Sequence, residues 1–409
     1  MKKKFARAAQ ADAAPPRWDL TQLYAGVDAP ELKADQKKAE DLAKEFAEYY
    51  EDGVMYLAGE QLGLAVEEYE EIESLRVKVE NYAVVFEAED DSNLAKTLPL
   101  KEWVSAVETK TLFFKEEIGR MEEADILAKM VAPELAQYAP WVAFVRKEYA
   151  HQLPLRFSGL QKKYEAVNDS SWQRLYQESL NDLCVEEGGK RIHYESFPVE
   201  GTLQEQLAAR QKIGTALQGQ SQRFAFIYNA IIKNMAIDAI PKNHRSPDQG
   251  VHLENGFNQE LGDGMFDSVK LSFISLSNRF YEMKAQKLKH EPLPSVLLYD
   301  QPFKAPEGEE KSYTWEEAKA LVLRAFRKFS PQFARLAQKA FDENRIDAEP
   351  REHKNPGAFM ESICPGYLPF VLLNFDGAPD SVTSSLAHEL GHYVHQVLAE
   401  NAQGLLLSD

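Results

Sequence analysis

Residues 384–395 have the sequence Ser384-Ser385-Leu386-Ala387-His388-Glu389-Leu390-Gly391-His392-Tyr393-Val394-His395, which contains the pattern HExxH. A helical pattern of apolar residues continues through it to about Glu400. Four residues make about one helical turn, roughly 6 Å of rise, so His388 and His392 project from one face of the helix. Two imidazoles in this relation can hold one metal ion, and catalytic zinc sites use such ligands.

The acidic residue of the pattern, Glu389, lies beside the face that carries the two histidines. A carboxylate in this position can take a proton from a zinc-activated water and later pass it to a leaving amine. The pattern therefore favours a zinc peptidase in which His388 and His392 bind Zn2+ and Glu389 is the general base. A surface motif that arose by chance is the alternative, because five residues alone are a weak signal.

A catalytic zinc normally has a third protein ligand, and the sequence after His392 limits which residues could supply it. The metzincin pattern needs Gly at position 395 and His at position 398, whereas this chain has His395 and Leu398. The downstream carboxylates are Glu400 and Asp409. Glu400 is on the same helix, about 18 Å of rise from His388, which is too far for it to bind the same metal ion. His395 itself lies roughly 10 Å of rise from His388, so we expect it to pack or to make hydrogen bonds rather than to bind the metal.

The remaining histidines show no ligand spacing, and we expect them to be solvated or hydrogen-bonded: His151, His193, His244, His252, His290 and His353.

A short apolar run, Tyr367 to Phe375, precedes the motif and is followed by the turn residues Asp376 and Gly377. We predict a strand here. Peptidases of the zincin type use an edge strand to hold peptide substrate by main-chain pairing, and this run is the candidate.

Most of the chain has helical patterns. Apolar residues from Leu62 recur every three or four positions to Phe86 and predict one long amphipathic helix whose Glu-rich face is solvated. Thr314 with Glu317 forms a predicted capping box, and Ser330-Pro331 predicts another helix start. Further helices are predicted at residues 100–120, 133–149, 171–183, 203–234 and 267–288, so the fold is mainly α with a small sheet.

Composition restricts the class of protein. The chain has 409 residues, 44% apolar residues and a formal charge of −18, so we expect a globular protein of at least two domains that binds neither nucleic acid nor an acidic membrane surface. Cys184 and Cys364 are too few for a disulfide framework and fit a reducing compartment. Residues 1–17 lack the apolar core of a secretion signal and predict a flexible leader, so we expect a cytoplasmic protein.

Several segments besides the motif resemble the M3 family of metallopeptidases, in particular its oligoendopeptidase F branch. Trp18-Asp19-Leu20-Thr21-Gln22-Leu23-Tyr24 is similar to the family's N-terminal signature. The other similar segments are Ser171 to Tyr176, Ser312 to Ala318 with Phe329-Ser330-Pro331, Gly357-Ala358-Phe359, and Val371 to Phe375.

The resemblance implies a mainly α fold in which two helical lobes flank a deep substrate channel, with a small antiparallel sheet before the zinc-binding helix. It implies a flexible leader (1–17), an N-terminal helical domain (18–200) and a catalytic zincin domain (201–409) that is incomplete at its C-terminus. The implied activity is zinc-dependent endopeptidase hydrolysis of short unfolded oligopeptides.

The same resemblance implies a third zinc ligand, a Glu on the following helix, at a position beyond Asp409. The family's oxyanion-stabilising residues are expected further downstream. A catalytically inactive, helical peptide-binding fragment is therefore the alternative hypothesis for this chain.

Overall fold

A computed structural model describes residues 14–151, 171–199, 201–298 and 311–407. The contacts divide the chain into two compact units, which are described separately. Unit 1 comprises Met1–Arg146 and Gly308–Asp409, and unit 2 comprises Lys147–Glu307. This division by contacts differs from the predicted domains 18–200 and 201–409, which stay a prediction.

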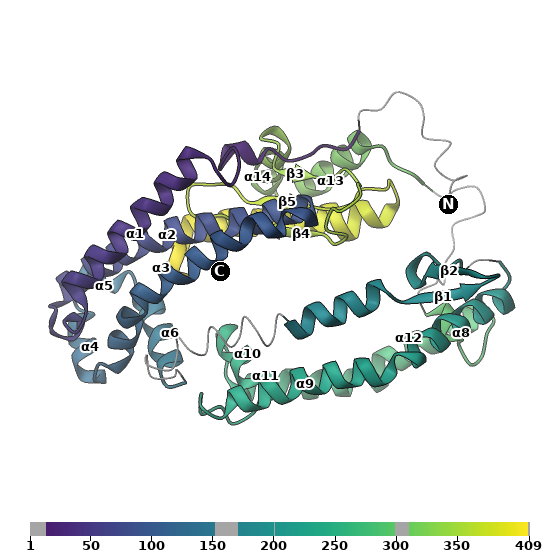
Figure 1. Ribbon diagram of the computed structural model, residues 1–409, viewed down its shortest axis with the longest axis horizontal. Helices are drawn as coiled ribbons and strands as arrows, with labels where there is room; N and C mark the ends of the chain where they lie inside the picture. The colour runs from purple at the N-terminus through teal and green to yellow at the C-terminus, as the bar shows by residue number, and fades with distance from the viewer. Residues whose placement is uncertain (1–13, 152–170, 200, 299–310, 408–409) are drawn as a thin grey trace. The chain divides into compact units, whose positions relative to one another are not determined.

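The N-terminal part of unit 1 is helical. Its helices are α1 (Pro30–Tyr50), α2 (Gly59–Glu89), α3 (Leu94–Arg120), α4 (Glu123–Lys129), α5 (Pro133–Ala136) and α6 (Ala139–Tyr149), of which the last residues enter unit 2. Helices α1, α2 and α3 pack side by side (Figure 1). The predicted apolar stripe of α2 is confirmed, because Leu62, Val66, Tyr69, Ile72, Val79 and Tyr82 are all buried. Gly63 lets α2 approach the backbone of Glu134 in α5 closely.

The C-terminal part of unit 1 holds a small sheet between helices. It contains α13 (Trp315–Phe329), α14 (Pro331–Asp342), β3 (Ile346–Asp347), β4 (Phe359–Glu361), β5 (Phe370–Leu372), a π-helical turn (Ser381–Ala387) and α15 (His388–Gln403). Both predicted helix starts are confirmed, since Thr314 and Glu317 form a capping box and the Ser330 side chain caps α14.

The sheet has the order β3-β5-β4, with β5 parallel to β3 and antiparallel to β4. The predicted small sheet is therefore present, but it is mixed rather than antiparallel throughout. Its two faces contribute to different apolar cores. Val371 packs with α13, α14 and α15, whereas Phe370 and Leu372 pack with Trp18 and the second half of α2.

The predicted N-terminal signature lies against this sheet region. The Asp19 N–H donates to the Asn344 carbonyl at 2.9 Å, and the Trp18 ring meets Phe370 edge-on at 5.6 Å. The signature thus supports the sheet on which α15 packs.

Unit 2 contains a hairpin of β1 (Cys184–Glu187) and β2 (Lys190–His193), which was not predicted, together with α8 (Leu203–Gly219), α9 (Ser221–Ala239), α10 (Gln249–Glu254), α11 (Gln259–Ser272) and α12 (Asn278–Leu288). Residues 171–181 are helical, as predicted. The single helix predicted over 203–234 is broken at Gln220. No helix in the described ranges is long and apolar enough to span a bilayer.

Together these elements confirm a mainly α fold with small sheets. The two lobes and the channel between them stay a prediction. Residues 1–13 of the predicted leader lie outside the described residues.

Candidate metal and peptidase site

The HExxH motif begins at the first residue of α15, directly after the π-helical turn Ser381–Ala387. One face of α15 is buried against α14, β4 and β5 because it carries Leu390, Tyr393, Val394 and Val397. The opposite face carries His388 and His392, which are exposed. The sequence pattern therefore fixes which side of the helix reaches solvent.

The two histidines of the motif lie one turn apart and converge. His388 Nε2 and His392 Nε2 are 3.1 Å apart, and the ring centroids are 4.7 Å apart. Two nitrogens bound at about 2.0–2.1 Å to one tetrahedral zinc ion lie roughly 3.3 Å apart, so the donor pair fits Zn2+. In the absence of metal, a protonated Nε2 of one ring can donate a hydrogen bond to the unprotonated Nε2 of the other.

Glu389 lies one residue further along the helix, between the exposed histidine face and the buried face. Its side chain is 7% exposed. A carboxylate at this border is sheltered from bulk solvent and adjacent in sequence to the metal-ligand candidates, which suits a general base.

A third protein ligand is not found in the described ranges, where no group of three or more His, Cys, Asp or Glu side chains could hold a metal ion. His395 is exposed on the same face of α15. His353 in unit 1 lies 3.3 Å from an Asp91 carboxylate oxygen. The other histidines outside the motif lie in unit 2: His151, His193, His244, His252 and His290.

The predicted strand at Tyr367 to Phe375 is shorter than expected and is not at the sheet edge. β5 covers Phe370–Leu372 and has a strand on each side, so its backbone is already paired. The prediction that this run is the edge strand is wrong. In the described residues the edge strand next to α15 is β4, which pairs only with β5. A strand of three residues gives too short a pattern to be predicted from sequence.

A cavity of about 550 Å3 lies along β4. It is lined by all three residues of β4, by the loop residues His353 to Pro356, and by residues at the end of α2 and the start of α3. No residue of β5 lines it. Of the three strands of this sheet, β4 is therefore the one that borders the cavity.

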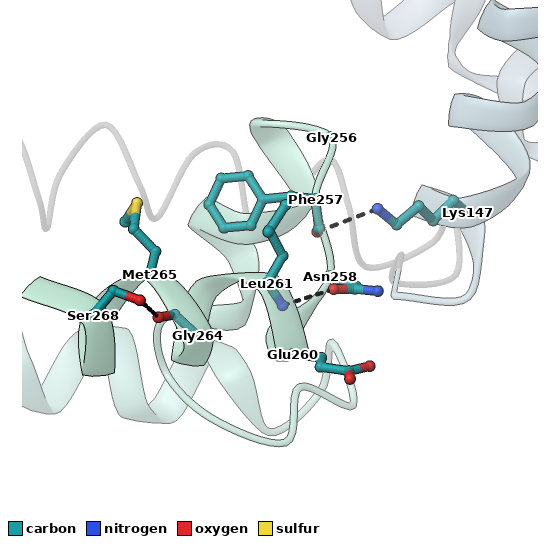
Figure 2. A pocket seen from close by; sticks show the side chains of 9 residues that line it. All are labelled: Lys147, Gly256, Phe257, Asn258, Glu260, Leu261, Gly264, Met265 and Ser268. Atoms are coloured by element: carbon teal, nitrogen blue, oxygen red, sulfur yellow. Dashed lines mark hydrogen bonds between the residues drawn. The ribbon is translucent and has the colours of Figure 1, made fainter.

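A second pocket, of about 970 Å3, lies in unit 2 around the start of α11 (Figure 2). Leu261 and Met265 supply apolar surface, and Lys147 Nζ donates to the Phe257 carbonyl at 3.3 Å. The described residues that line it include neither histidine nor cysteine. Glu260 is the one carboxylate among its described lining residues, so they offer no pair of metal ligands.

The region that carries the HExxH motif matches a known protein family. Residues 257–407 match the model of peptidase family M3. This part of the chain belongs to peptidase family M3. The predicted membership of that family is thus confirmed, and the relatives support its oligoendopeptidase F branch.

An M3 relative, an oligoendopeptidase F homolog of Mycoplasma genitalium, is 33% identical over 173 residues, which cover 40% of this chain and 26% of the relative. Oligopeptidase PepF of Bacillus subtilis is 22% identical over 162 residues, which cover 40% of this chain and 23% of PepF. The matches thus span about a quarter of the length of these curated relatives.

Solved structures share the fold. A crystal structure of a Chlamydophila abortus protein superposes with a TM-score of 0.67 at 20% identity, and the match covers 96% of this chain and 68% of that chain. Oligoendopeptidase-F from Enterococcus faecium gives a TM-score of 0.52 at 18% identity over 76% of this chain and 62% of that chain. At these identities the likeness shows the fold alone, and it agrees with the mainly α fold described above.

Proposed function

We propose that the protein is a zinc-dependent endopeptidase that hydrolyses short, unfolded oligopeptides. The observation that carries the proposal is the pair of exposed Nε2 atoms of His388 and His392, 3.1 Å apart on a helix of an M3 region. A zinc ion held by these nitrogens would act as a Lewis acid that activates water and polarises the scissile carbonyl.

The chain's own residues supply the remaining chemistry. Glu389 takes the proton from the attacking water and delivers it to the leaving amine. The extended substrate backbone pairs with the free edge of β4 beside α15, and not with residues 367–375 as the sequence predicted. A channel between two helical lobes would admit short peptides and exclude folded proteins. Because both cysteines are free, we place the protein in the cytoplasm.

The second candidate is a catalytically inactive, helical peptide-binding protein. It is favoured by the two-histidine site, because no described group supplies three metal ligands. Two imidazoles hold zinc more weakly than a three-ligand site.

Hydrolysis of an internally quenched peptide tests the proposal. We expect Glu389→Gln to abolish cleavage while zinc stays bound, because the substitution removes the base and keeps the size of the side chain. The matched control is Glu316→Gln on the exposed first turn of α13. Full activity of Glu389→Gln would refute the mechanism, and peptide binding without turnover by the unmodified chain would favour the second candidate.

A further inference from the structure

The cavity along β4 has a defined relation to the strand. Phe359 and Glu361 stand opposite Leu372 and Phe370, which belong to the core shared with α2, whereas Met360 stands opposite Val371, which packs with α15. A peptide paired with the free edge of β4 would alternate in the same way. Every second side chain of the peptide would therefore point toward the side where α2 ends.

Main-chain hydrogen bonds hold the part of the lining at the end of α2 against the loop before β4. The Asp91 N–H donates to the His353 carbonyl at 2.8 Å, and the Asn355 N–H donates to the Ala88 carbonyl at 3.1 Å. The loop that leads into β4 is thus fastened to the end of α2. This makes the cavity part of the folded unit.

The lining combines apolar and acidic groups. Val84, Leu94 and Phe359 supply apolar surface. Three carboxylates also line the cavity: Glu87, Asp91 and Glu361. Such a lining suits a side chain with a long apolar stem and a cationic end.

Of the three carboxylates in the lining, Asp91 is the most exposed to solvent. Among the described residues of the lining, Lys354 is the one lysine or arginine, and its ammonium is turned inward, where it binds Asp347 and the carbonyl of Leu373. Lys101 pairs with Glu87 at 2.7 Å from outside the lining. The Asp91 side chain remains 77% exposed beside His353.

We propose that this cavity is a specificity pocket that receives a lysine or arginine side chain of a peptide paired with the free edge of β4. The inference deepens the proposed peptidase function and rests on it. The pocket selects the basic residue, and the backbone pairing sets the register, so the selection acts at one position of the peptide.

Binding of fluorescent, acetylated alanine pentapeptides to the full chain tests this inference, with zinc chelated so that nothing is cleaved. Lysine is placed at each position in turn and compared with norleucine, which has a similar stem and no charge. We expect about three- to tenfold tighter binding of lysine at one position and no preference at its immediate neighbours.

Asp91→Asn should weaken this preference, and Asp91→Asn/Glu361→Gln should remove it. Asp28→Asn, an exposed carboxylate of the same unit, should leave it unchanged. Equal binding of lysine and norleucine at all positions, a preference unaffected by the double variant, or no binding of any peptide would overturn the inference. Hydrolysis is measured separately with zinc restored, so a lysine preference without cleavage would refute only the peptidase, and cleavage without a preference would refute only the pocket.

Discussion

Lys354 Nζ lies 2.9 Å from Asp347 Oδ1, and both side chains are fully buried in unit 1. The ammonium also donates to the carbonyls of Asp347, Glu349 and Leu373, while Arg351 contacts both carboxylate oxygens of Asp347 at 2.7 Å. Burial lowers the pKa of Lys354, and the hydrogen bond to Asp347 opposes that shift. One cation thus joins β3, the end of β5 and the loop that leads to β4.

Removing this cation should destabilise unit 1. We expect Lys354→Met to lower the free energy of unfolding by about 3 kcal/mol, because Asp347 keeps its buried charge and loses a partner. Chemical denaturation measures the change. The exposed pair Lys37–Asp41 is the control, and Lys37→Met should have a far smaller effect, because exposed ion pairs contribute little to stability. A loss for Lys354→Met no larger than that of the control would show that the buried pair contributes little.

At Gly63, α2 approaches the backbone of α5 closely. A Cβ built there would lie 2.5 Å from the Glu134 carbonyl carbon and 2.7 Å from its oxygen, both backbone atoms. We expect Gly63→Ala to destabilise the protein by about 1–3 kcal/mol because the two helices must separate.

The matched control is Gly214→Ala within α8, where a Cβ would have no neighbour within 4 Å. Alanine there should stabilise the helix by about 0.5–1 kcal/mol, which thermal unfolding can detect. Equal effects of the two substitutions would contradict the packing argument.

Cys364 should be protected from alkylation. Burial raises the pKa of its thiol to about 11 from an ordinary 9.0, and the residue is 4% exposed. At pH 8 the reactive thiolate is therefore about a hundredfold rarer than for an unshifted thiol. Mass spectrometry after iodoacetamide treatment should find Cys184, which is half-buried, modified first. Early modification of Cys364 in the folded protein would refute this assignment.

The same shift has a consequence for stability. The pKa of Cys364 is higher in the folded state than in the unfolded state, so this thiol contributes to the free energy of unfolding below pH 9. That contribution is lost as the pH rises from about 9 to 11, because the unfolded chain loses this proton first. Cys364→Ala should flatten the fall in the free energy of unfolding over that interval. An unchanged slope would show that Cys364 does not cause it.

The sequence predicted the features that depend on local pattern. The buried stripe of α2, the capping box at Thr314 and the helix start at Ser330 follow from spacing and side-chain chemistry within a few residues. The helical phase of HExxH likewise predicted that His388 and His392 share a face.

Features that depend on distant contacts were missed. The length of β4 and its edge position could not be predicted, because three residues carry no periodic signal. The start of α11 at Gln259 was also missed, although Asn258 caps it by accepting from the Leu261 N–H. The buried Lys354–Asp347 pair has no local signature, since its partners are brought together only by the folded loop and sheet.

Zinc binding by isothermal titration calorimetry tests the central claim most directly. The unmodified chain should bind one Zn2+, and His388→Ala and His392→Ala should each weaken binding by about a hundredfold or more. His395→Ala is the matched control, because its rise of roughly 10 Å from His388 places it outside the metal pair, and it should bind zinc as the unmodified chain does. Unchanged binding by His388→Ala, or an equal loss in His395→Ala, would contradict the assignment of the metal site.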